Sequence, residues 1–220
     1  MPNYIYFQHD QKRLFDRFPA DSGIIGVSDW REYNGNPHKL LNILSEYKRP
    51  VPASSCPRLF ISHRQVDDHY ALRIAQLAAH CKFEFWVDVL DPSLRSLDGN
   101  RNYTKEEISV LTACIIEMAL INCTHVITIM SPNTRGSLWV PYEYGRITGA
   151  SGDYDNACAW RHPSLLKEDL PEYMDLGIVT SSEAGIKHWL NAEYSSWIKK
   201  GSIGICNAVW NHGDQQELPD

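Results

Sequence analysis

Residues 58–89, RLFISHRQVDDHYALRIAQLAAHCKFEFWVDV, decide the fold of this chain. They begin with the apolar run RLFIS (58–62), which lies between a proline and a polar turn and predicts a buried strand. Apolar residues then recur at helical spacing, which predicts a helix over 68–82. FEFWVDV (83–89) is aromatic and β-branched and predicts a second strand. Strand, helix and strand in this order begin the alternation of an α/β protein.

Capping residues and apolar runs extend the pattern along the chain. Either Asp67 or Asp68 is placed to cap the helix after the first strand. Thr104 and Glu107 have the spacing of a capping box, so a second helix is expected to start there. HVITIM (125–130) is apolar and β-branched, and it predicts the third strand.

The alternation continues towards the C-terminus. NACAWRH (156–162) predicts a fourth strand, LGIVTSS (176–182) a short edge strand, and residues 181–200 an amphipathic helix. Strands and helices that alternate in this way form a central parallel sheet with helices on both faces. The near-continuous apolar strands also fit a sheet that is covered on both sides. We therefore predict an α/β fold.

The chain of 220 residues is expected to form one domain with appended segments. Residues 1–55 are predicted to be an N-terminal extension of unknown role, with one helix near 38–47. The α/β domain is predicted over 56–200. Residues 201–220 are predicted to form a C-terminal tail, and its last part, 213–220, is expected to fray.

Charge and cysteine usage narrow the class of protein. The formal net charge is −6, which argues against a general nucleic-acid surface. None of the six cysteines forms a C-x-x-C pair, and no basic and apolar leader stands at the N-terminus. We expect the cysteines to be reduced, mostly buried side chains in a cytoplasmic protein. The histidines lack the spacing of metal ligands, so no metal site is predicted.

One apolar segment, residues 108–130, has the length of a membrane span. Glu117 would lie near the centre of the bilayer, where an acidic group is costly. The polar stretch Asn122, Cys123 and Thr124 also interrupts the apolar run. We therefore interpret the segment as a helix followed by a buried strand, and we predict no membrane association.

Polar segments follow each of the first three predicted strands. Ser62 and His63 follow the first, Asp88 ends the second, and residues 131–143 follow the third. Ligands of open α/β sheets bind beyond the carboxyl ends of the strands, so these segments are expected to meet at one site. His63 taken alone also fits an exposed loop histidine. The chain contains neither G-x-G-x-x-G nor a P-loop, so the usual phosphate-binding motifs are absent.

The segment SPNTRGSLWVPYEYGR (131–146) holds the main candidate site residues, Ser137, Trp139 and Glu143. In a helix, residues four apart lie one above the other on the same face, so Trp139 and Glu143 can share one wall of a pocket. A flat ring beside a carboxylate suits a flat, cationic substrate that is linked to a sugar. The same spacing also fits a purely structural arrangement, with the tryptophan in the core and the glutamate solvated.

Taken together, RLFISHRQVDD, FEFWVDVLDP and SPNTRGSLWVPYEYGR resemble the strand-end motifs of a bacterial TIR (Toll/interleukin-1 receptor) domain, over about Arg58 to Trp197. The last motif is similar to the S-x-W-x-x-x-E helix of that family. Two positions depart from it: Val140 stands where the family often has cysteine, and His63 where it often has tyrosine. The resemblance implies a flavodoxin-like fold.

The resemblance also implies an activity. Many bacterial TIR domains cut NAD between nicotinamide and ribose, several of them in anti-phage defence of the Thoeris type. NAD would then be a substrate, and no further cofactor is implied. Glu143 would stabilise the oxocarbenium-like transition state, and Trp139 would stack on a ring. Ser62 and His63 would hold the diphosphate or the ribose, and Asp88 and Ser137 would complete the substrate site.

The partners implied by the resemblance are NAD, further copies of the chain and an effector that senses the product. Residues 90–103, LDPSLRSLDGNRNY, occupy the place of the family's BB loop, through which TIR domains associate. The product remains open between ADP-ribose, a cyclic isomer and a conjugate. Two other functions also remain open. One is a non-catalytic TIR adaptor, and the other is an enzyme like a nucleoside deoxyribosyltransferase, with Glu143 as covalent nucleophile.

Overall fold

A computed structural model describes residues 41–42, 57–97, 99, 101, 103–151, 154–199 and 210–219. Most of the predicted N-terminal extension, including all but two residues of the helix expected near 38–47, lies outside the described residues. The described chain falls into two compact units. One comprises residues 57–87 and 123–219 and contains the sheet, and the other contains residues 88–122.

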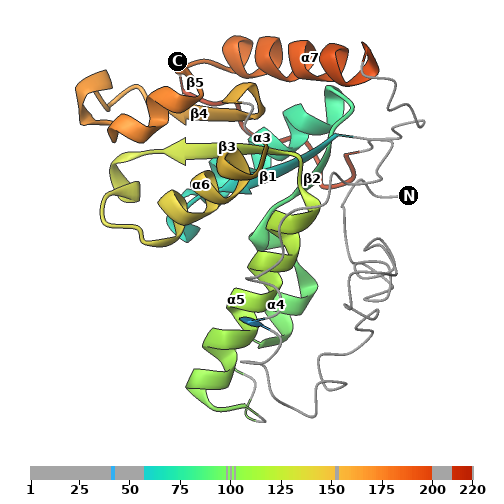
Figure 1. Cartoon of the computed structure of the whole chain (residues 1–220), viewed down its shortest axis with the longest axis vertical. Coiled ribbons are helices and arrows are strands. Elements are labelled where there is room, and N and C mark those ends of the chain that lie inside the picture. The colour runs from blue at the N-terminus through green and yellow to red at the C-terminus, as the bar shows by residue number, and fades with distance from the viewer. Residues whose placement is uncertain are drawn as a thin grey trace. The chain divides into compact units, whose positions relative to one another are not determined.

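The sheet unit is built on five parallel strands in the order β2-β1-β3-β4-β5, as Figure 1 shows. This order is that of the flavodoxin-like fold. The prediction of an α/β fold with a central parallel sheet is therefore confirmed. The strands are β1 (Arg58–Ser62), β2 (Glu84–Trp86), β3 (His125–Met130), β4 (Ala157–Arg161) and β5 (Ile178–Thr180).

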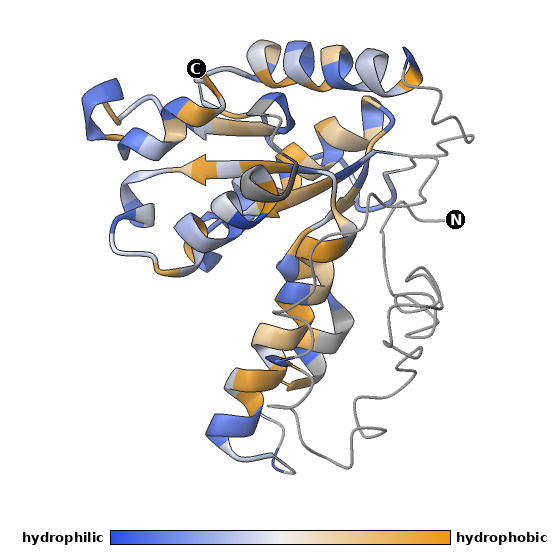
Figure 2. Cartoon of the chain, viewed as in Figure 1, coloured by the Kyte–Doolittle hydropathy of each residue, from blue (hydrophilic) through white to orange (hydrophobic). Residues whose placement is uncertain are grey.

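Both central strands, β1 and β3, are buried at every residue, which explains their near-continuous apolar sequence. Figure 2 shows the same property as orange colour along β3. The edge strand β2 is shorter than the predicted 83–89. A 3-10 turn replaces its last residues, and the Asp91 N–H closes this turn by donating to the Asp88 carbonyl oxygen at 2.8 Å.

Helices cover both faces of the sheet, as predicted. They are α3 (Asp68–His80), α6 (Trp139–Ser151) and α7 (Glu183–Lys199). Side chains alternate between the faces along a strand. On one face Ser62 contacts α6. On the other, Trp160 contacts Tyr70 of α3, and His125 contacts Trp189 of α7.

The start of α3 differs from the prediction, because neither aspartate caps the helix with its side chain. The Asp67 carboxylate instead accepts hydrogen bonds from the loop after β3, and the Asp68 carboxylate contacts His63. Tertiary partners have replaced the local cap that the sequence predicted. The same two aspartates therefore fix the turn that follows β1.

The second unit contains the 3-10 turn η4 (Asp88–Leu90) and the helices α4 (Pro92–Leu97) and α5 (Lys105–Asn122). The predicted capping box is confirmed: Thr104 Oγ1 accepts the Glu107 N–H at 3.2 Å, and Glu107 accepts the Thr104 N–H at 2.7 Å. The bonds from Thr104 lower the pKa of the Glu107 carboxyl. No helix in the described part of the chain is long and apolar enough to cross a membrane.

The segment 90–103 is not the simple loop that the sequence predicted, because residues 92–97 form α4. Proline at the first helical position favours this start. The buried Asp91 carboxylate accepts the Leu94 N–H at 3.2 Å and so caps the helix. Asp91 therefore has a local structural role and does not lie on the surface.

The expectation of a frayed C-terminus is wrong for residues 214–218. The Gln76 amide donates to Asp214 at 3.1 Å and accepts the Gln215 N–H at 3.1 Å. Leu218 is buried, and its N–H donates to Glu183 at the start of α7. The last described residues are therefore bound to α3 and α7.

Candidate functional site

The central feature of the site is a short hydrogen bond between Ser62 and Glu143. The Ser62 hydroxyl donates to Glu143 Oε2 at 2.5 Å, across 81 positions of sequence. Ser62 ends β1, and its exposed fraction is 1%, while that of Glu143 in α6 is 6%. At this distance the contact is at the short end of the range for O–H···O hydrogen bonds. The structure thus brings together two of the predicted site residues at the carboxyl edge of the sheet.

The apolar pattern of α6 explains why Glu143 is buried. Val140, Tyr144 and Ile147 recur at helical spacing and are all buried. Glu143 lies one turn after Val140 and so shares the face that packs on the sheet. Ser137 has a capping role, because its hydroxyl accepts the Val140 N–H at 3.3 Å.

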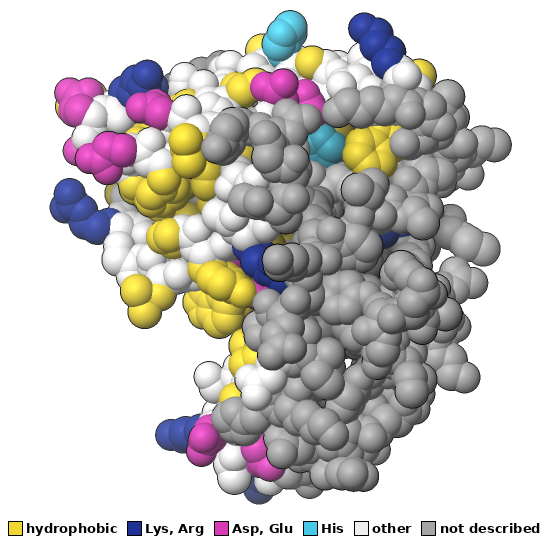
Figure 3. Space-filling model, viewed as in Figure 1, with side chains coloured by type: hydrophobic (Ala, Val, Ile, Leu, Met, Phe, Trp, Pro, Cys, Tyr) yellow, Lys and Arg dark blue, Asp and Glu magenta, His cyan; other side chains and the backbone are white. Residues whose placement is uncertain are grey.

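The structural interpretation of this motif, with a core tryptophan and a solvated glutamate, is wrong on both counts. Trp139 is 42% exposed, whereas Glu143 is almost completely buried. The Trp139 ring makes an edge-to-face contact with Tyr142, with ring centroids 5.9 Å apart. Leu138 beside them is 88% exposed. Figure 3 shows apolar side chains, in yellow, on the surface of the molecule.

This exposed aromatic pair differs in kind from the packed tryptophans of the core. Trp86, Trp160 and Trp189 are all buried. Exposed large apolar groups that cluster often mark a binding surface. Trp139 and Tyr142 therefore offer ring surface on the helix that carries Glu143.

His63 has a different environment from the one expected of an exposed loop histidine. Its ring is only 1% exposed, and Nε2 lies 3.0 Å from Asp68 Oδ1. Nδ1 lies 3.4 Å from the Ile61 carbonyl oxygen. Both neighbours are acceptors, and a neutral ring can donate to only one of them, of which the Asp68 oxygen is the nearer. His63 thus fixes the turn after Ser62, and its contact with substrate remains a prediction.

Asp67 is a site-supporting residue that the sequence reasoning missed. It is fully buried, and its two oxygens accept from Ser131 Oγ at 2.6 Å and Asn133 Nδ2 at 2.8 Å. Ser131 and Thr134 also form a capping box within the same loop. These bonds tie the turn after β1 to the loop that leads into α6. They therefore fix the two segments that carry Ser62 and Glu143.

Asp88 lies in the second unit, where it bonds to Val89. Its predicted place beside Ser62 and His63 remains a prediction. In the described ranges, no three His, Cys, Asp or Glu side chains gather as a metal site.

The described cysteines do not provide an alternative nucleophile. Cys81, Cys114, Cys123 and Cys158 are thiols, and all four are buried. Burial raises the pKa of the Cys114 thiol to about 12, with Glu117 adding to the effect, and burial also raises the pKa of Cys158. A thiol that stays protonated is a poor nucleophile. Among these groups, Glu143 is thus the better candidate for chemistry at the sheet edge.

Comparison of the chain with protein-family models, with curated proteins and with solved structures finds no match. The function of the chain is therefore inferred from the geometry of the site and from the sequence motifs.

Proposed function

We propose that this chain is a TIR-type enzyme that cleaves NAD between nicotinamide and ribose. The observation that carries the proposal is the buried Glu143 carboxylate, which Ser62 holds at the carboxyl edge of a parallel sheet. Parallel sheets of this order bind ligands at that edge. A buried carboxylate is also costly unless it is well bonded, so such groups gather where chemistry needs them.

The proposed mechanism needs one carboxylate. Nicotinamide leaves as a neutral group from a cationic ring, so no acid has to protonate it, unlike the leaving group of most glycosidases. Positive charge then develops on the ribose. Glu143 stabilises this charge and holds the ribose hydroxyls. The Ser62 hydrogen bond holds the carboxylate in place for this role.

The proposed setting follows from the resemblance of the motifs to bacterial TIR domains. In it the enzyme works in the cytoplasm, in anti-phage defence of the Thoeris type. Its product is ADP-ribose, a cyclic isomer or a conjugate, which a downstream effector senses. Water access to the ribose during the reaction decides among these products.

Incubation of the purified chain with NAD is the direct test. Release of nicotinamide with stoichiometric loss of NAD is the expected result. A non-catalytic adaptor would leave NAD intact. An enzyme like a nucleoside deoxyribosyltransferase would instead exchange the base of a deoxynucleoside when a second free base is supplied. Intact NAD under saturating conditions overturns the proposal.

Trp139→Ala is expected to weaken substrate binding with little effect on stability. The ring is 42% exposed, so its removal leaves no core cavity. Stacking of one base on an aromatic side chain is worth about 1–3 kcal/mol, which corresponds to a KM increase of roughly 5- to 150-fold. Steady-state kinetics and a thermal melt measure the two effects. Leu138→Ala, at a more exposed neighbour, is the control. An unchanged KM would show that Trp139 does not stack on the substrate.

We further propose that activity requires self-association through residues 90–103. Two of its charged residues already have local partners, because Asp91 caps α4 and the Arg95 guanidinium donates to the Val89 carbonyl oxygen. Arg101 is exposed, so it is the better candidate for a contact between copies. Contacts of a head-to-tail kind build open filaments when they do not close.

Activity per molecule is accordingly expected to fall on dilution, and Arg101→Glu is expected to move this fall to a several-fold higher protein concentration. Lys199→Glu makes the same charge reversal at the end of α7 and serves as the control. Specific activity over a wide range of protein concentration gives the measurement. A flat dilution curve together with a fully active Arg101→Glu would rule out this role of the segment.

A further inference from the structure

Thr128 is a buried polar residue without a visible partner. Its exposed fraction is 0%, and its hydroxyl has no hydrogen-bond partner among the described residues. It lies in the middle of β3, between the apolar residues Ile127 and Ile129. An unsatisfied buried hydroxyl costs about 1–3 kcal/mol. Valine would fill the same space without that cost, so the hydroxyl requires an explanation.

The position of Thr128 links it to the candidate site. It is the register partner of Ser62 across the β1–β3 pair. Neighbouring strands lie about 4.8 Å apart, and paired residues project from the same face of the sheet. That face is the one where Ser62 bonds to Glu143. On the other side Thr128 is paired with Ala159, which has no polar atoms in its side chain. Ser62 is thus the polar cross-strand neighbour of the threonine.

Ser62 has a single hydroxyl proton, and Thr128 is a candidate second acceptor for it. A serine hydroxyl has one proton, and here it is donated to Glu143. If ribose hydroxyls of a substrate bind Glu143 Oε2, they compete with the Ser62 hydroxyl for that oxygen and displace it. A buried hydroxyl without an acceptor would then oppose substrate binding. A rotation of Ser62 about one bond restores a hydrogen bond only if a new acceptor lies nearby, and the hydroxyl of its register partner Thr128 is the candidate for that acceptor.

We propose that Thr128 is a positioning residue. Its hydroxyl oxygen accepts the hydrogen bond of Ser62 when a substrate hydroxyl replaces Ser62 on Glu143. This rests on the proposed function of the site. The pair of hydroxyls then has two arrangements. In the first, Ser62 donates to Glu143 and Thr128 lacks a partner. In the second, Ser62 donates to Thr128 and a ribose hydroxyl takes its place on Glu143 Oε2. The cost of the unsatisfied threonine in the first arrangement favours the exchange.

Thr128→Val tests the proposal, since it removes the hydroxyl and keeps the shape. The variant is expected to melt at the same or a higher temperature, yet to lose about tenfold in kcat/KM for NAD. Thr128→Ser, which keeps a hydroxyl, is expected to retain most of the activity. Thr148→Val makes the same change at another buried threonine, whose hydroxyl bonds within α6, and is expected to keep its activity.

A double-mutant cycle with Ser62→Ala shows whether Thr128 acts through Ser62. In the Ser62→Ala background, Thr128→Val is expected to have no further effect on kcat/KM. An equal loss in both backgrounds, or a fully active Thr128→Val, overturns the proposal while leaving NAD cleavage intact. If Thr128→Val fails to fold, Thr128→Ala takes its place in the same cycle. A wild-type chain that releases no nicotinamide overturns the proposed function, and this inference with it.

Discussion

Glu143→Gln is expected to abolish NAD cleavage while the chain folds normally. Glutamine keeps the shape of the side chain and can still accept the Ser62 hydroxyl proton, but it lacks the negative charge. Loss of one electrostatic stabiliser of a transition state typically lowers the rate by ~10²–10³. Because Glu143 is the carboxylate that the proposed mechanism uses, we expect the loss to reach at least this range. Nicotinamide release under saturating NAD gives the rate, and circular dichroism reports the fold.

Glu172→Gln is a matched control for this variant. Glu172 is exposed, it lies in the 3-10 turn η8 (Glu172–Leu176), and the proposed mechanism gives it no role. It should therefore keep wild-type turnover. A folded Glu143→Gln with turnover near that of the wild type would show that the reaction depends on another group. Equal losses in both variants would point to a general effect of charge.

The order of the elements could be predicted from the sequence because the strands are more apolar than the chain segments on either side of them. β1 and β3 are buried on both faces, and their continuous apolar runs identify them. The capping box at Thr104 fixed the start of α5, since both of its hydrogen bonds are local. Local hydrogen bonds of this kind form in the folded chain as the spacing predicts, because no tertiary partner competes for the same groups.

The burial of the site residues was harder to predict from the sequence than the order of the elements. The spacing of Trp139 and Glu143 indicated a shared helix face, but it could not show which residue meets the sheet. The flanking residues decide this, because Val140, Tyr144 and Ile147 form the buried stripe. Weighing this whole stripe, and not the motif alone, would have placed Glu143 in the interior.

Long-range polar partners other than Ser62 and Glu143 escaped prediction. Asp67 had the sequence context of a helix cap, yet its carboxylate bonds to Ser131 and Asn133. Gln76 and Arg73 looked like ordinary polar residues of α3, yet both bind the C-terminal segment. A single sequence holds no signal for such pairs, because their partners lie more than 60 positions away.

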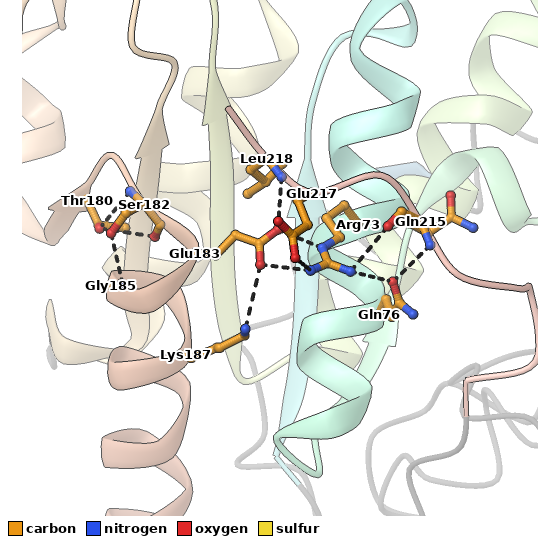
Figure 4. A network of polar contacts seen from close by, with 10 residues as sticks. All are labelled: Arg73, Gln76, Thr180, Ser182, Glu183, Gly185, Lys187, Gln215, Glu217 and Leu218. Atoms are coloured by element: carbon orange, nitrogen blue, oxygen red, sulfur yellow. Dashed lines mark hydrogen bonds and ion pairs between the residues drawn. The ribbon is translucent and has the colours of Figure 1, made fainter. Parts of the chain in front are cut away.

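The contacts of Arg73 are the basis for the second large effect that we expect. Its guanidinium donates to both oxygens of Glu183, at 2.6 and 2.8 Å, and so joins α3 to the start of α7 (Figure 4). The C-terminal segment completes the network: the Gln215 carbonyl oxygen accepts from Arg73, and the Leu218 N–H donates to Glu183. The side chains of Arg73 and Glu183 are 12% and 13% exposed. A paired charge this deeply buried depends on its partner.

Arg73→Met is expected to lower the free energy of unfolding by about 3 kcal/mol, because it leaves Glu183 buried without its main partner. For a domain of this size the melting temperature should fall by roughly 6–12 °C. Lys187→Met is the control, since Lys187 lies 3.6 Å from the same carboxylate but is 49% exposed. Exposed pairs contribute about 0–1 kcal/mol, so this variant should melt close to the wild type. The double variant Arg73→Met/Glu183→Leu should regain much of the loss, since it leaves no unpaired charge.

The difference between wild type and Arg73→Met should also depend on pH. The hydrogen bonds from Arg73 lower the pKa of the Glu183 carboxyl in the folded chain, and the Leu218 N–H adds to this. A group whose folded pKa is lowered stabilises the fold above its unfolded pKa, which is about 4.3 for glutamate. That stabilisation is lost as the pH falls through the folded value. The gap between the two melting temperatures should therefore be constant from about pH 6 to 8 and shrink below about pH 4. A gap that stays the same down to pH 3 would show that Arg73 stabilises the fold by packing and not through the charge of Glu183.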